Sequence, residues 1–246
     1  MAPLPSETIT YVRRRIDQLS HFVQNPNARE MLAEGTMNPV RAMVIRAVLA
    51  TPGLPDFLQE RSYISGYRRA GFDVLGTGYH AVTVTDGPAA VKKFYRHTAG
   101  LTESEQNGQI KVWDAKQKLA LEHLGAYAVP QTFTIESNPL NSAESVVTAT
   151  QERIESVGAI DIFAPEQNLD GTQSFIADSY AMQYQSGIAA VPDLFGRNNA
   201  VIEATTGAVK LIDPITLVRD DPIDENGYAR VSRYLEARHA RDTHRA

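Results

Sequence analysis

The pattern of apolar and polar residues divides the chain into a helical first part and a second part that begins with strands. Between residues 6 and 64, apolar residues recur at helical spacing, and from Phe72 the period changes to that of strands. Ser6 suits the N-cap of a first helix, and Pro39 suits the start of a second. The Thr-Pro-Gly-Leu-Pro segment at 51–55 predicts a helix end. We therefore expect a helical N-terminal extension over residues 1–70 that packs on a separate domain over residues 71–246.

Five extended runs predict strands, and together with the expected helices they indicate an α+β chain. A helix is expected over 109–125, between the third and fourth runs, because its apolar residues follow helical spacing and Gly125 ends it. The connection over 155–172 reads as a loop, followed by a helix up to residue 188, and a final helix is capped by Asp224 or Asn226. The five runs cover residues 72–75, 82–84, 89–95, 131–135 and 145–150.

One stretch from Val191 to Leu217, VPDLFGRNNAVIEATTGAVKLIDPITL, predicts a hairpin with polar ends. Asp193 and Asn198 lie in the loop before its first strand, and Asp213 follows its second strand. The hairpin would bring two carboxylates and a carboxamide to one edge, which suits a Mg²⁺–phosphate site. An ordinary polar hairpin explains the same residues, because Asp and Asn are common in turns.

The amino-acid composition excludes several classes of function but does not select one. The chain has 246 residues, 43% of them hydrophobic, a net charge of −5 and no cysteine. The absence of cysteine excludes disulfides, thiolate catalysis and cysteine–zinc sites, and the charge does not favour nucleic acid as a partner. We expect no membrane span and no conventional signal peptide, and therefore a cytoplasmic protein or one exported without such a peptide.

The residues Asp193-Leu194-Phe195-Gly196-Arg197-Asn198, followed by a hairpin and Leu211-Ile212-Asp213, resemble the catalytic loop and metal-binding strand of the protein-kinase superfamily. A glycine turn, Gly76-Thr77-Gly78, and a later Ala90-Val91-Lys92 on a strand are similar to its nucleotide-binding elements. The four motifs also come in the order that this family uses. The resemblance implies that ATP and Mg²⁺ are bound.

The resemblance also implies a role for each matched residue. Gly76, Thr77 and Gly78 would cover the ATP phosphates. Lys92 would contact the α- and β-phosphates, and Lys93 would point to the opposite face of its strand. Asn198 and Asp213 would hold Mg²⁺, and Asp193 would orient the acceptor hydroxyl.

Two further positions are matched from the same resemblance. The helix that supplies a glutamate to pair with the strand lysine in kinases carries Gln117 at the matching place, with Asp114 as the acidic alternative. The segment after the fifth run would be the hinge, where the backbones of Glu152 and Ile154 would bind adenine. A glutamine anchors a lysine more weakly than a carboxylate does, so an activating partner protein is a further implication.

The implied fold is a two-lobed protein-kinase-like fold, with a five-stranded antiparallel sheet in an N-lobe over 71–154 and a reduced C-lobe over 155–246. Few residues follow Asp213, and Pro192 stands where many kinases have an arginine. The chain is therefore similar to the minimal kinases that some bacteria deliver into host cells as effectors. The implied activity is phosphotransfer to Ser or Thr of a protein; a small-molecule phosphotransferase, a nucleotidyl transferase and a pseudokinase that only binds remain the alternatives.

Overall fold

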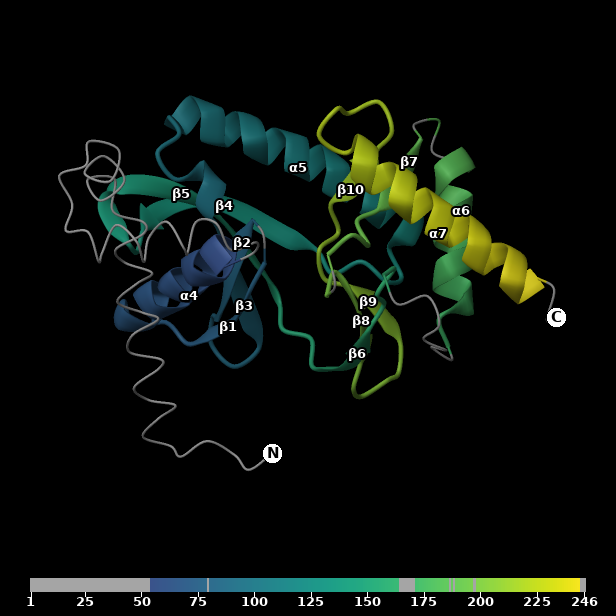
Figure 1. The fold of residues 1–246 in the computed structure, drawn as a ribbon, viewed down its shortest axis with the longest axis horizontal. Helices are drawn as coiled ribbons and strands as arrows, with labels where there is room; N and C mark the ends of the chain where they lie inside the picture. Colours follow the sequence, from purple (N-terminus) through teal and green to yellow (C-terminus); the bar gives the residue numbers. More distant parts are fainter. Residues whose placement is uncertain are drawn as a thin grey trace. The chain divides into compact units, whose positions relative to one another are not determined.

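The computed structural model describes residues 54–78, 80–163, 171–185, 187, 189–196 and 198–243, with the backbone alone for 54–59 and 243. The chain divides into two compact units, residues 1–84 and 85–246. Figure 1 labels the helices and strands of the chain. The helices expected before residue 54 lie outside the described residues.

The first unit contains helix α4 (Leu54–Arg69) and the strands β1 (Val74–Thr77) and β2 (Ala81–Thr85), which pair antiparallel. The helix that the Thr-Pro-Gly-Leu-Pro segment was expected to end lies outside the described residues. Helix α4 begins at Leu54 within this segment, where a proline in the first turn has no hydrogen bond to lose. Gly71 ends α4 with a positive φ of 91°, and Phe72 N–H donates to the Tyr67 carbonyl at 3.0 Å. This glycine-dependent cap turns the chain into β1.

Five strands form one sheet in the order β1-β2-β3-β5-β4. In the second unit, β5 (Asn141–Glu152) pairs antiparallel with both β3 (Ala90–Tyr95) and β4 (Gln131–Asn138). A short 3₁₀ helix, η1 (Arg96–Thr98), follows β3. These observations confirm an α+β chain with a five-stranded antiparallel sheet. The strands β4 and β5 are longer than expected, since a turn of only two residues joins them.

Helix α5 (Glu103–Leu124) packs on the strands of the second unit. It begins before the expected start at residue 109 because Thr102 and Glu105 form a capping box, in which each side chain binds the other's backbone N–H. Its buried Trp113 lies against Tyr95 and Phe133, with ring centroids 4.4 and 5.5 Å apart. The face of β3 and β4 that carries these two rings is therefore the one that α5 covers.

The stretch from Val191 to Leu217 forms two nested antiparallel pairs. The outer pair joins β7 (Ala190–Pro192) to β10 (Thr216–Val218), and the inner pair joins β8 (Ala200–Glu203) to β9 (Val209–Leu211). The inner pair confirms the expected hairpin. Strand β6 (Ser156–Ala159), in a segment expected to be a loop, adds to β8.

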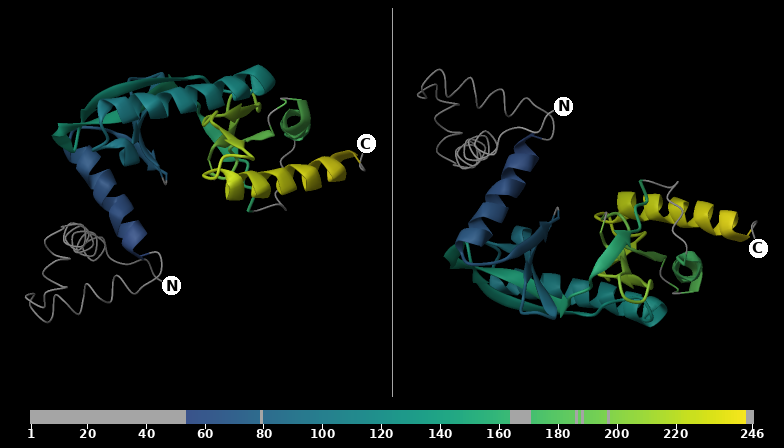
Figure 2. Two further views of the ribbon diagram at one scale, coloured as in Figure 1. Left: turned by 90° about the horizontal axis from the view of Figure 1, so that it is seen from above. Right: turned by 90° about the horizontal axis from the view of Figure 1, so that it is seen from below.

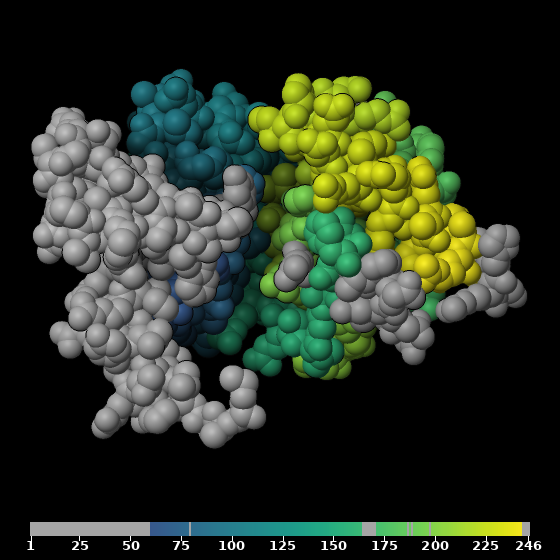
Figure 3. Space-filling view, in the orientation of Figure 1, coloured from purple at the N-terminus to yellow at the C-terminus, as the bar shows by residue number. Residues whose placement is uncertain are grey.

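Helices α6 (Gln173–Gln185) and α7 (Glu225–Thr243) pack against each other beside these small sheets (Figure 2). The outer side of α7 forms much of the visible surface of this part (Figure 3). One apolar core joins α5, α6, α7 and the short strands. Its largest fully buried side chains include Leu124, Phe175, Ile176, Met182, Leu194, Leu211 and Leu235.

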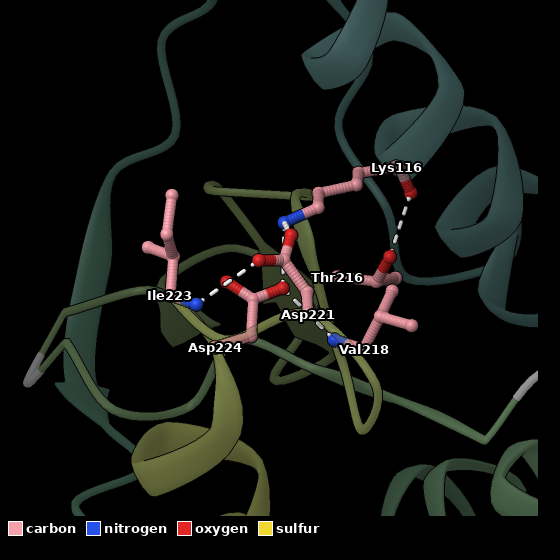
Figure 4. Close-up of polar contacts among 6 residues, drawn as sticks. All are labelled: Lys116, Thr216, Val218, Asp221, Ile223 and Asp224. Atoms are coloured by element: carbon pink, nitrogen blue, oxygen red, sulfur yellow. Dashed lines mark hydrogen bonds and ion pairs between the residues drawn. The ribbon is translucent and has the colours of Figure 1, made fainter.

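Lys116 on α5 ties that helix to the loop before α7 (Figure 4). Its Nζ donates to Asp221 Oδ2 at 2.8 Å and to Asp224 Oδ2 at 2.6 Å, while its carbonyl accepts from Thr216 Oγ1 at 3.1 Å. Burial opposes the charge on Lys116, but the bonds to both carboxylates outweigh burial and raise its pKa. Because Asp224 is only 8% exposed and also accepts from Val218 N–H, this cluster holds α5, β10 and α7 together.

Replacing Lys116 by methionine is expected to lower the free energy of unfolding by roughly 3 kcal/mol, because the Asp224 carboxylate stays buried without its cation. Urea unfolding at neutral pH measures the loss. Lys118→Met, at an exposed position of the same helix, is the control and should change stability by less than about 0.5 kcal/mol. Equal effects of the two substitutions would show that the cluster contributes nothing specific.

Candidate active site

Lys93 lies at the centre of a polar group in the second unit. Its side chain is buried, with 7% of the residue exposed, and its Nζ donates to the backbone carbonyl of Ile212 at 2.7 Å. The same Nζ lies 3.9 Å from Asp213 Oδ1. The lysine next to the expected metal-binding carboxylate is therefore Lys93.

Lys92 was expected to face the site, but it does not lie beside Asp213. Its Nζ forms an ion pair with Glu136 on β4, at 2.9 and 3.1 Å from the two carboxylate oxygens. This pair lies on the face of the sheet opposite to Lys93, because neighbouring residues of a strand point to opposite faces. The two lysines do alternate as predicted, but their assignment to the two faces is reversed.

The assignment is reversed because helix α5 covers the face of β3 that carries Lys93. Residues paired directly across an antiparallel sheet share a face, and both Lys93 and Phe133 pair with Ala149. Phe133 contacts Trp113 of α5, so Lys93 shares the helix-covered face. The sequence of β3 does not show which face is covered, because its apolar residues do not alternate with polar ones. Phe94 and Tyr95 are neighbours and both are buried.

The loops after β7 and β9 bring Asp193 and Asp213 into the same group. Asp193 directly follows β7, and its N–H donates to the Ile215 carbonyl at 3.3 Å. Asn199 joins the two loops, because its carbonyl accepts from the N–H groups of Ile212 and Asp213 at 2.8 and 3.3 Å. Sequence reasoning singled out Asn198, which is exposed, and missed the neighbouring Asn199 as the connecting residue.

The electrostatics of the group confirm that its charges interact. Burial, followed by repulsion from Asp213, raises the pKa of Asp193 to about 7, although N–H groups of Phe195 and Gly196 oppose the shift. Burial lowers the pKa of Lys93, and attraction to Asp213 and Asp193 opposes the effect. The upward shift in the pKa of Asp193 is in the direction that suits a general base near neutral pH.

Three buried glutamines, connected to one another by hydrogen bonds, contact this group through the Ile212 carbonyl. Gln131 Nε2 donates to the Ile212 carbonyl at 3.0 Å and to Gln151 Oε1 at 2.6 Å. Gln117 Nε2 donates to the Gln131 carbonyl at 2.9 Å, and Gln117 Oε1 accepts from Gln131 N–H at 2.7 Å. The carboxamide expected to pair with Lys92 thus binds the backbone of β4, while Asp114 is exposed.

The proposed hinge and glycine turn are also placed by the structure. Glu152 is exposed at the end of β5, and Ile154 is half-buried in the connection to β6. In the first unit, Gly78 N–H donates to the Ala81 carbonyl at 2.8 Å, the Thr77 hydroxyl donates to Glu60, and Gly76 lies in β1. Neither glycine has a positive φ, so the binding of phosphates by this turn and of adenine by the hinge stay predictions.

An exposed aromatic pair flanks Asp193. Phe195 N–H donates to Asp193 Oδ1 at 2.9 Å, and its ring meets Phe163 edge-on with centroids 5.4 Å apart. These residues are 43% and 50% exposed, and the Arg230 guanidinium lies 5.7 Å from the Phe195 centroid. Phe195, whose N–H binds the carboxylate, thus carries exposed apolar surface with the Arg230 cation beside its ring.

The residues present fit a magnesium ion bound together with phosphates. Among the described residues no three His, Cys, Asp or Glu side chains gather as a metal site. Mg²⁺, however, is commonly bound by one or two carboxylates plus substrate phosphates. Asp213 Oδ1 is buried and accepts no hydrogen bond from the part of the chain that the structure describes, so it has a lone pair to offer a cation.

The comparisons with known proteins assign no family and no function to the chain. The chain matches no protein-family model, and no curated protein matches its sequence. Within the described ranges no helix has the length and apolar character needed to cross a membrane. The functional argument therefore depends on the geometry of Lys93, Asp193 and Asp213.

Proposed function

We propose that the second unit transfers the γ-phosphoryl group of ATP to a hydroxyl group, with Ser or Thr of a protein as the acceptor. One observation carries the proposal: a buried lysine and two carboxylates from three separate segments form one group, in which Lys93 Nζ lies 2.7 Å from the Ile212 carbonyl and 3.9 Å from Asp213 Oδ1. Burial and the charge of Asp213 raise the pKa of Asp193 in the same group. A buried ammonium with one close acceptor has hydrogen atoms left for phosphate oxygens. Catalysis of phosphoryl transfer is mainly positioning and charge stabilisation, and this group supplies both.

Each residue has a role that its surroundings support. The Lys93 ammonium would bind phosphate oxygens, whose negative charge offsets the burial that lowers its pKa. Asp193 would orient the acceptor hydroxyl and take its proton. Asp213 and Asn198 would hold Mg²⁺, which when bound neutralises charge on the phosphates.

The aromatic surface beside Asp193 supports a protein acceptor. Phe195, which follows Asp193 by two residues, exposes its ring together with that of Phe163, and such rings offer contact area to the side chains that flank a hydroxyl in a polypeptide. Arg230 adds a cation beside the Phe195 ring. Ser or Thr in a protein segment is therefore the acceptor that we propose.

The test is to incubate the purified full chain with Mg²⁺, generic protein acceptors and ATP labelled at either the α- or the γ-phosphate. Transfer of the γ-label to protein, lost in Asp193→Asn, is the expected result. Transfer of the α-label would instead indicate a nucleotidyl transferase. Binding of Mg·ADP without any transfer would indicate a pseudokinase, and absence of both would overturn the proposal.

A further inference from the structure

One backbone carbonyl, that of Ile212, connects the lysine and the carboxylate of the site. It accepts from Lys93 Nζ at 2.7 Å and from Gln131 Nε2 at 3.0 Å. Asp213 directly follows this carbonyl in the chain. A shift of the Ile212 carbonyl would therefore move the lysine contact and the carboxylate together.

Gln131 is held more firmly than an ordinary side chain at the start of a strand. It is 5% exposed, and both hydrogens of its Nε2 have acceptors, the Ile212 carbonyl and Gln151 Oε1. Its Oε1 lies 3.3 Å from the Tyr95 hydroxyl, which donates to it, and Gln117 binds its backbone on both sides. Buried networks in which all members are satisfied are rigid.

Lys93 depends on this network for its orientation. The nearest carboxylate oxygen, Asp213 Oδ1, is 3.9 Å away, beyond hydrogen-bond distance. Helix α5 presents the carboxamide of Gln117 to β4 and gives Lys93 no carboxylate at that position. The Ile212 carbonyl is thus the close acceptor that orients the ammonium, and Gln131 fixes that carbonyl.

We propose that Gln131 is a positioning residue of the phosphotransfer site, which sets the separation of Lys93 and Asp213 through the Ile212 carbonyl they share. The inference rests on the proposed function. Only a group with two donor hydrogens can bind both acceptors at once, so neither methionine nor an ionised glutamate replaces it. Gln131 touches no reacting atom and acts through Lys93 and Asp213.

The matched control is Gln106, an equally buried glutamine of the same unit. It is 0% exposed, and its Nε2 also donates to two backbone acceptors, the Thr98 and Ser145 carbonyls, at 2.9 and 3.1 Å. Ser145 and Gln151 lie on β5 about 20 Å apart along the strand. Replacing Gln106 therefore causes a comparable loss of buried hydrogen bonds away from the site.

The experiment compares Gln131→Met with Gln106→Met in the full chain. Both should lower Tm to a similar extent, but only Gln131→Met should lower kcat, by roughly 10- to 100-fold, because small misplacements of reacting groups have effects of that size. The KM for ATP should change less than kcat, and calorimetry should show Mg·ADP still binding. A merely structural role would move Tm and leave kcat per folded molecule unchanged.

Gln151→Met is the second variant if Gln131→Met does not fold. It removes one acceptor of the Gln131 carboxamide and should lower kcat in the same direction by a smaller factor. Wild-type kcat in folded Gln131→Met, or in Gln151→Met where only that variant folds, overturns the inference while leaving the proposed function standing. Failure of the wild-type chain to transfer phosphate, with or without binding of Mg·ADP, overturns both.

Discussion

Lys93→Met is expected to lower the rate of phosphotransfer by roughly 10²- to 10³-fold, the usual loss when one charge-stabilising donor is removed from an active site. The reason is that Lys93 is the buried lysine beside Asp213. Initial rates with γ-labelled ATP at saturating acceptor measure the effect. The affinity for Mg·ADP, measured by calorimetry, should fall as well, since the ammonium would contact phosphates in the bound nucleotide.

Lys92→Met is the control for this prediction, because it changes the same charge at the neighbouring position of β3. Lys92 pairs with Glu136 at a partly exposed place on the other face, and such pairs contribute about 0–1 kcal/mol to stability. Its activity should stay within about twofold of wild type. A large loss in Lys92→Met together with an active Lys93→Met would reverse the assignment of the two lysines.

Asp193→Asn is expected to abolish phosphotransfer and at the same time to stabilise the protein at alkaline pH. Burial and the nearby Asp213 raise the pKa of Asp193 from 3.8 to about 7, so the folded state holds its proton more tightly than the unfolded chain does. As pH rises from about 4, the unfolded chain loses this proton first and wild-type stability falls. The loss is complete above pH 7, and asparagine avoids it.

The gain has an upper bound of about 4 kcal/mol at pH 8, because each unit of pKa shift corresponds to about 1.4 kcal/mol. Screening at the partly exposed carboxylate lowers the gain that is measured. Urea unfolding at pH 8 and pH 5 should give a stability difference between variant and wild type that shrinks at the lower pH. The wild-type rate should increase with pH through about 7, as Asp193 becomes the free base.

Asp86→Asn is the control, since it removes the same charge from an exposed turn of the second unit. It should change neither the stability difference between pH 8 and pH 5 nor the rate profile. If Asp193→Asn were no more stable than wild type at pH 8, the carboxylate would carry no ionisation penalty. Its role as a base that titrates near neutral pH would then be wrong.

Much of the architecture follows from local sequence. The capping box of Thr102 and Glu105 sets the start of α5, and the apolar runs around the Thr-Thr-Gly turn pair as β8 and β9. Because both features depend on residues close in the chain, pattern reasoning finds them. The positions of Asp193 after β7 and of Asp213 after β9 follow in the same way.

The amino-acid sequence by itself determined the five strands of the large sheet, the β8–β9 hairpin, the helices of the second unit and the placing of two carboxylates in neighbouring loops. It did not predict β6, β7 or β10. The tertiary structure alone decided that Lys93 faces those carboxylates, because the packing of Trp113 on Tyr95 and Phe133 selects one face of the sheet. It also decided the role of Gln131, which bonds to residues 20 and 81 positions away. Contacts over such separations depend on the folding of whole elements against each other, and no local pattern of residues encodes them.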